Sequence, residues 1–208
     1  LLFLNNSNTA NINIYILLVY IYKLRIYMKE ITQAEMNVAL ILVKSPEVIY
    51  NANSLSKVVG ITPMGALKIL RRLEQENIVK PKKIGKAIIY KVNVEDSYAR
   101  KYISLILVRE SQYANPQAKR WINELKKIRN AEVIILFGSV LEKSHPNDID
   151  VLLITDQKHF SKLQQEIKEL NEINIKKIHP IYQTYEDIIK NIKKRDKPII
   201  NAIKGIII

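Results

Sequence analysis

Before residue 80, apolar residues recur every three or four positions, the spacing of short helices that bury one face. Thr32 is predicted to cap the first helix, with Glu35 completing a capping box, and Ser45-Pro46 ends it. Ser54 is predicted to cap a short second helix, which Gly60 terminates. The pattern therefore indicates a cluster of small helices at the start of the folded chain.

A third helix and a pair of strands follow. Thr62-Pro63 supplies an N-cap and a proline at the first helical position. Residues 80–91, KPKKIGKAIIYK, read as two strand-like runs around a lysine-rich turn that contains Gly85. The predicted order is helix, helix, helix and basic hairpin.

This order resembles a winged helix-turn-helix DNA-binding domain, with TPMGALKILRRLEQENIV similar to a recognition helix and KKIGK similar to the tip of the wing. Residues 62–91 hold eight Lys or Arg against two Glu, a net charge of +6. Double-stranded DNA is the expected partner; contact with another protein is the alternative use of such a domain.

The resemblance and the charge together nominate the DNA-contacting residues. The start of a recognition helix lies near base edges, and flanking cations meet phosphates. The residues expected near bases are Thr62, Met64, Gly65 and Lys68. Those expected at phosphates are Arg71 and Arg72, and those expected at phosphates or in the minor groove are Lys82, Lys83 and Lys86.

Two longer helices are predicted next, over residues 96–115 and 116–129, separated at Asn115-Pro116. Trp121 falls on the apolar stripe of the second helix and is expected to be a core anchor. The first of these helices is expected to rest between domains or to form the seam of a homodimer.

Two apolar runs in the last third of the chain, Val133–Phe137 and Ile149–Ile154, carry the main candidate chemistry. Gly138-Ser139 follows the first run, and Asp148 and Asp150 begin the second. Residues two apart on a strand face the same side, so both carboxylates are expected to point to one place. Paired carboxylates suit Mg²⁺, and exposed amides after a glycine suit a phosphate.

This pattern resembles the polymerase-beta-like nucleotidyltransferases in their small, minimal form. The resemblance implies that Gly138 and Ser139 contact the triphosphate of an NTP substrate, and that Asp148 and Asp150 are catalytic ligands of Mg²⁺ or Mn²⁺. A solvated strand end beside a plain turn is the alternative interpretation.

The chain departs from that family at the third carboxylate, which belongs on a following strand. The strand predicted at Ile175–Gln183 contains no Asp or Glu, and His179 is its one ligand-type residue. A lone histidine before Pro180 is interpreted as a packed or surface residue. The absence of a third carboxylate on this strand bears on catalysis more than on the fold.

The predicted fold class is α+β: an N-terminal winged helix-turn-helix, a helical connector, and a C-terminal nucleotidyltransferase-like mixed sheet with helices. The corresponding ranges are 28–95, 96–130 and 131–208. Residues 1–27, which begin with Leu and contain the apolar run IYILLVYIY, are predicted to be upstream translation before Met28 or a disordered extension. That run is too short to span a bilayer, and no membrane partner is predicted; an arm that associates with a membrane surface is the alternative interpretation of these residues.

Composition adds a constraint on partners. The 208 residues carry a formal net charge of +13, which favours nucleic acid, and contain no cysteine, which excludes disulfides and zinc–thiolate sites. A cytoplasmic location is expected.

Three functions remain open at this stage. The first is a DNA-binding nucleotidyltransferase that moves a nucleoside monophosphate from an NTP to an unknown acceptor. The second is a transcriptional regulator with a degenerate, nucleotide-sensing domain. The third is a member of a toxin–antitoxin-type pair with a protein partner.

Overall fold

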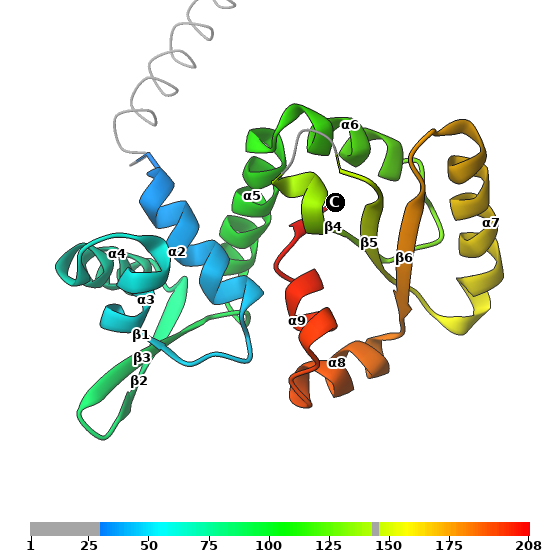
Figure 1. Cartoon of the computed structure of the whole chain (residues 1–208). Coiled ribbons are helices and arrows are strands. Elements are labelled where there is room, and N and C mark those ends of the chain that lie inside the picture. The colour runs from blue at the N-terminus through cyan, green and yellow to red at the C-terminus, as the bar shows by residue number, and fades with distance from the viewer. Residues whose placement is uncertain (1–29, 143–145) are drawn as a thin grey trace, which may run out of the picture.

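The computed structural model describes residues 30–142 and 146–208. Within these ranges the chain has the α+β fold that the sequence predicts, with two separate sheets and helices around them (Figure 1). The extension predicted at residues 1–27 lies outside the described residues. Every described helix is too short or too polar to cross a membrane.

The N-terminal elements form a winged helix-turn-helix. Two antiparallel pairings give the sheet order β1-β3-β2, in which β2 and β3 are the arms of the wing (Figure 1). The helices pack on this sheet around a core that includes Leu55, Leu70 and Tyr90. The elements are α2 (Gln33–Lys44), β1 (Tyr50–Asn51), α3 (Ala52–Val59), α4 (Pro63–Gln75), β2 (Val79–Ile84) and β3 (Ala87–Val92).

Most predicted helix ends are confirmed, and one is wrong. Thr32 and Thr62 accept backbone N–H groups as N-caps, and Gly60 ends α3 in the left-handed conformation at φ 76°. The N-cap of α3 is Asn51, and Ser54 is its partner in a capping box. The prediction placed the start too late because both residues are good caps, and only the observed one follows a strand.

The predicted capping-box role of Glu35 is also wrong, because its carboxylate is used in a tertiary contact. Arg72 Nη1 donates to Glu35 Oε2 at 2.5 Å, and the Tyr102 hydroxyl donates to Glu35 Oε1 at 2.9 Å. Glu35 is almost fully buried. Three helices, α2, α4 and the connector α5 (Ser97–Tyr113), are therefore joined at one carboxylate.

The C-terminal sheet has the order β6-β5-β4-β7. β5 runs antiparallel to β4 and parallel to β6, and β7 is antiparallel to β4. Its elements are α6 (Pro116–Leu125), β4 (Val133–Phe137), the 3₁₀ turn η1 (Gly138–Leu141), β5 (Ile149–Ile154), α7 (Gln157–Ile173), β6 (Ile178–Gln183), α8 (Tyr185–Lys193), α9 (Lys197–Ala202) and β7 (Ile206–Ile207).

Helices cover both faces of this sheet. Helices α6 and α7 share a core with one set of strand residues, and α8 and α9 share a second core with the alternate set (Figure 1). Trp121 is 2% exposed in the first core, which confirms its predicted anchoring role. Strands with both faces buried explain the unbroken apolar runs in the sequence.

An ion pair between buried Lys44 and partly buried Glu110 connects the winged helix to the C-terminal sheet. Lys44, at the end of α2, contacts both oxygens of Glu110 on α5 at 2.5 Å and donates to the carbonyl of Gly205 at 2.5 Å. Burial lowers the pKa of Lys44 and raises that of Glu110, although each partner's charge opposes the shift. Gly205 directly precedes β7, so the last strand is tied to the winged-helix part of the chain.

We expect Lys44→Ala to lower the free energy of unfolding by about 3 kcal/mol, because removal of Lys44 leaves the partly buried charge of Glu110 and the carbonyl of Gly205 without their partner. Chemical denaturation of the full chain measures the loss. Lys80→Ala is the control, since Lys80 and its partner Glu95 are both exposed and should contribute little. Equal effects of the two substitutions would contradict the structural role of Lys44.

Candidate nucleotide and nucleic-acid sites

Pairing of β4 with β5 brings the two halves of the C-terminal motif together. The pair is antiparallel, and Phe137, the last residue of β4, lies opposite Asp150. Gly138 and Ser139 leave β4 at the same edge at which Asp148 and Asp150 enter β5. The structure thus places Gly-Ser and Asp-x-Asp at one end of the sheet, as the spacing predicts.

Gly138 and Asp150 lie against each other where these halves meet. It has φ +79°, a conformation that residues with a Cβ rarely adopt. A Cβ added there would lie 2.2 Å from Asp150 Oδ2, so the carboxylate occupies the space that any other side chain would need. A glycine is required at this position for two separate reasons.

The two carboxylates differ in their surroundings. Asp148 has a side chain that is 42% exposed, whereas Asp150 lies farther into the sheet. Burial raises the pKa of Asp150, the nearby charge of Asp148 raises it further, and His179 opposes both effects. Two close carboxylates of this kind form a negative point that a cation stabilises.

His179 lies beside this pair, a position that sequence reasoning did not assign to it. β6 runs parallel to β5, and His179 is in register with Asp150. Its Nδ1 is 3.4 Å from Asp148 Oδ2, and its side chain is 60% exposed. It is a surface residue, as interpreted, but it stands at the site. The position of His179 depends on the register of the parallel strands β5 and β6, which local sequence does not reveal.

The ligand set for a cation therefore consists of two carboxylates with an imidazole nearby. β6 contributes no carboxylate. Within residues 30–142 and 146–208, no group of three or more His, Cys, Asp or Glu side chains is arranged to hold a metal ion. Mg²⁺ commonly uses one or two protein carboxylates and completes its shell with water and substrate phosphates, so Asp148 and Asp150 fit such a metal–nucleotide complex.

Asn115 holds the turn that follows β4. Its Nδ2 donates to the carbonyls of Val140 and Leu141, both at 3.0 Å, and its Oδ1 caps α6 by accepting from Ala118 N. One side chain thus fixes the turn containing Gly138 and Ser139 to the start of α6. The sequence indicated Asn115-Pro116 only as a break between helices.

The winged helix presents a second candidate site on α4 and the wing. Met64 is 72% exposed, and the cations at the outer surface of both elements are also exposed. These cations are Lys68, Arg71, Lys82, Lys83 and Lys86. Thr62 is exposed as well, but its hydroxyl accepts the N–H of Gly65 as the cap of α4.

Arg72 is placed differently from the other nominated cations. Its guanidinium is bonded to Glu35 and to Glu76, and its side chain is 17% exposed. It therefore anchors α4 to α2, and the expected phosphate contact gives way to this structural role. The i, i+1 spacing of Arg71 and Arg72 puts only one of them on the outer face of the helix.

We expect Gly138→Ala to destabilise the chain more than Gly60→Ala, by about 1–3 kcal/mol. Both glycines have positive φ, at 79° and 76°, but nothing lies within 4 Å of a Cβ added at Gly60. The difference between the two variants in chemical denaturation isolates the clash with Asp150. Equal losses of stability in the two variants would show that the Asp150 carboxylate does not occupy the space of a side chain added at Gly138.

Comparisons with known proteins find distant structural likenesses and one family model. The chain is similar to the homodimeric winged helix-turn-helix DNA-binding domain of Mb0332 from Mycobacterium bovis, a possible ArsR-family transcriptional regulator, at 13% identity and TM-score 0.33 over 40% of this chain and 73% of that one. It is also similar to the adhesin competence repressor AdcR of Streptococcus pyogenes, at 12% identity and TM-score 0.35 over 60% of this chain and 85% of AdcR. A third similar structure is that of the zinc-responsive MarR family member ZitR of Lactococcus lactis, at 12% identity and TM-score 0.30 over 57% of this chain and 95% of ZitR.

Likeness at this level carries no functional information. No curated protein sequence matches the chain. One family model matches residues 74–198, more than half of the sequence, and runs from the end of α4 to α9. The chain therefore belongs to a family of unknown function, DUF6932.

Proposed function

We propose that this protein binds double-stranded DNA through its winged helix and uses its C-terminal site to transfer a nucleoside monophosphate from an NTP to an acceptor hydroxyl. The observation that carries the second part is the contact between Gly138 and the Asp150 carboxylate. It unites a phosphate-binding type of turn and a pair of metal-binding carboxylates in one place. Either feature alone is common.

Each residue at the site has a distinct part in this proposal. Asp148 and Asp150 would hold Mg²⁺ or Mn²⁺, which when bound neutralises charge on the phosphates. Backbone N–H groups of Gly138 and Ser139 would donate to phosphate oxygens, and the absence of a side chain at Gly138 permits close approach. In the transfer, an acceptor oxygen forms a bond to the α-phosphorus, the bond from that phosphorus to the bridging oxygen breaks, and pyrophosphate leaves.

The acceptor proton needs a base, and His179 is the residue beside the carboxylate pair that suits this task. A neutral imidazole nitrogen can accept the proton of a hydroxyl within hydrogen-bond reach. Its position on β6, in register with Asp150, supports this role. A carboxylate would have done the same task in the polymerase-beta-like pattern.

The DNA-binding part rests on exposed cations at the outer surface of α4 and the wing. Lys68 and Met64 lie near the start of α4, where base edges would be read, and Arg71 lies one turn farther along. Lys82, Lys83 and Lys86 lie on the wing hairpin, which extends away from the helices (Figure 1). A homodimer would match this use, since the outer face of α5 exposes Tyr98, Leu105 and Val108.

A specific observation favours a second candidate, a regulator that binds the nucleotide without transferring it. The resemblance to the polymerase-beta-like nucleotidyltransferases implies a third carboxylate on this strand, and β6 has His179 in its place. A metal ion would therefore have one carboxylate ligand fewer than in those enzymes. Binding of NTP and metal would then act as a signal for DNA binding. Labelled NTP separates the candidates: transfer to protein, RNA or a small acceptor indicates the enzyme, and binding without transfer indicates the sensor.

We expect the combined variant Lys82→Ala, Lys83→Ala and Lys86→Ala to bind duplex DNA more weakly and with less salt dependence. Loss of three phosphate contacts should reduce the slope of log K against log salt by about 3. Fluorescence anisotropy with a labelled duplex measures both effects. The matched control replaces Lys190, Lys193 and Lys194 with Ala, which removes the same charge from exposed positions of α8. Identical curves for the two variants would remove the wing from the interface.

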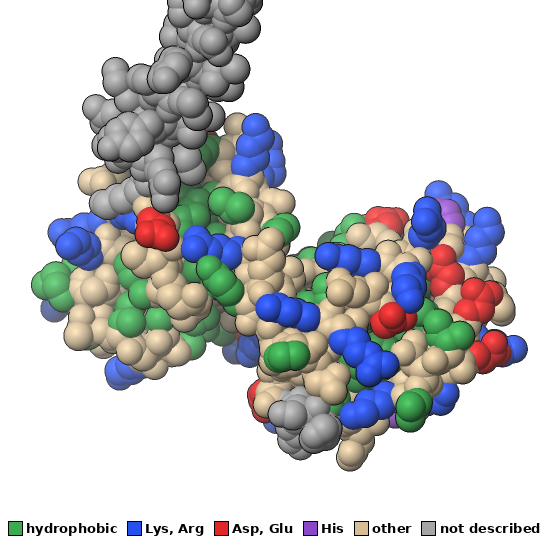
Figure 2. Space-filling view, turned by 90° about the horizontal axis from the view of Figure 1, so that it is seen from above, with side chains coloured by type: hydrophobic (Ala, Val, Ile, Leu, Met, Phe, Trp, Pro, Cys, Tyr) green, Lys and Arg blue, Asp and Glu red, His purple; other side chains and the backbone are tan. Residues whose placement is uncertain are grey.

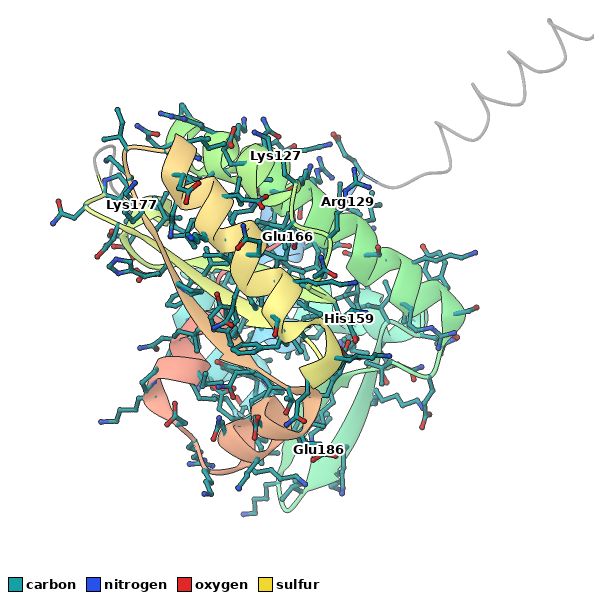
Figure 3. The ribbon with its side chains drawn as sticks, turned by 90° about the vertical axis from the view of Figure 1, so that its right-hand side faces the viewer. Lys127, Arg129, His159, Glu166, Lys177 and Glu186 are labelled. Carbon is teal, nitrogen blue, oxygen red and sulfur yellow. The ribbon has the colours of Figure 1, made fainter. Side chains whose placement is uncertain are left out.

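We expect Asp148→Asn combined with Asp150→Asn to weaken NTP binding in the presence of Mg²⁺ by at least about tenfold, or about 1.4 kcal/mol, because the metal loses its ligands. Isothermal titration calorimetry with each of the four NTPs measures the loss. Glu186→Gln is the control, since Glu186 is exposed on α8 at the opposite end of the sheet (Figure 3). If the double variant and the control bind alike, the carboxylate pair does not hold the nucleotide.

A further inference from the structure

The outer face of α6 and the segment that follows it form a strongly basic surface. Residues 116–130 contain five cations and one acid, Glu124. All five cations are exposed: Lys119, Arg120, Lys126, Lys127 and Arg129. The opposite face is fixed in the core by Trp121, Ile122 and Leu125, so the cations face outward by necessity. We call these five residues the α6 basic surface.

Few of these charges are neutralised within the protein. Lys127 pairs with Glu124 at 2.7 Å. Among the described residues, the other four cations make no ion pair with an acid. Glu166 of α7 lies nearby (Figure 3), but its oxygens accept the backbone N–H groups of Arg129 and Asn130 and the side-chain amide of Asn130. A helix face that serves only solubility usually mixes both signs, whereas residues 116–130 carry five cations against one acid.

The surface begins at the proposed nucleotide site. Asn115, the N-cap of α6, also bonds to the turn after Ser139, and Lys119 is only four residues farther along. On the other side of the site, Lys176 donates to the carbonyl of Pro146, two residues before Asp148. Figure 2 shows Lys and Arg side chains gathered over this upper side of the C-terminal part of the chain. A polyanion on α6 would therefore lead toward Asp148 and Asp150.

From these observations we infer that the α6 basic surface binds the phosphodiester backbone of a nucleic-acid strand, and that this strand is the acceptor of the proposed transfer. The inference rests on the proposed function and deepens it by naming the acceptor class. Cations spaced over residues 119–129 match a repeating phosphate chain better than a single small anion. The terminal hydroxyl of the strand would supply the attacking oxygen in that transfer.

The test uses the full chain with the wing already disabled by Lys82→Ala, Lys83→Ala and Lys86→Ala, so that binding through the winged helix is removed. In this background, one variant also carries Lys119→Ala, Arg120→Ala, Lys126→Ala and Arg129→Ala. The control instead carries Lys190→Ala, Lys193→Ala, Lys194→Ala and Lys197→Ala, the same charge change at exposed positions around α8. Affinity is measured for a 30-nucleotide RNA, a single-stranded DNA and a duplex of the same sequence.

We expect the α6 variant to bind at least one of these probes about tenfold or more weakly than the control, with a salt slope lower by about 3 for a single strand. The three probes distinguish RNA from DNA as the source of the phosphodiester chain. Labelled NTP should be incorporated into the preferred probe by the wing-disabled chain and by the control, and not by the α6 variant. Circular dichroism confirms that all variants remain folded.

Equal binding by the α6 variant and the control would overturn the inference, as would transfer of label to a small molecule or protein with no contribution from oligonucleotide. Failure of the proposed function looks different. In that case the wing-disabled chain neither binds NTP in calorimetry nor labels any acceptor, whatever the α6 variant does with nucleic acid.

Discussion

The contact between the Asp150 carboxylate and the bare Cα of Gly138 is the constraint on which the candidate site depends. It requires β4 and β5 to pair with Phe137 opposite Asp150, and it requires positive φ at the residue that follows. Both conditions place the Asp148 and Asp150 carboxylates beside the turn that starts at Gly138. The repulsion between the two acids is the cost of this arrangement, and a bound cation would remove it.

The same end of the sheet is linked to the winged helix. Gly205 packs against the carbonyl of Leu136 and the side chain of Phe137, where an added Cβ would clash at 2.3 Å and 2.8 Å. Its carbonyl accepts from Lys44 of α2, whose other partner is Glu110 of α5. The residues immediately before Gly138 thus contact Gly205, which Lys44 ties to the winged-helix part of the chain. Figure 1 shows α5 between the two sheets, where it joins these parts.

Features set by short-range spacing were predictable, and those set by distant partners were not. The caps at Thr32 and Thr62, the glycine end of α3 and the buried stripe around Trp121 follow from local pattern. The use of Glu35 was mispredicted because its partner Arg72 is 37 positions away and outcompetes the local cap. Lys44 and Gly205 are separated by 161 positions, and no local signal connects them.

The candidate site is likewise predictable from the sequence only in part. Alternation along a strand puts Asp148 and Asp150 together, but only the register of β5 with β6 brings His179 to them. The cations of α6 can be read from the sequence. That they share one exposed surface follows only from the packing of the opposite, apolar face in the core.

The most direct test is a crystal structure of the full chain with Mg²⁺ and a non-hydrolysable NTP analogue. The triphosphate should lie against the backbone of Gly138 and Ser139, with density for a metal ion between its oxygens and the carboxylates of Asp148 and Asp150. A nucleotide bound elsewhere, or carboxylates that contact neither metal nor phosphate, would contradict the proposed site.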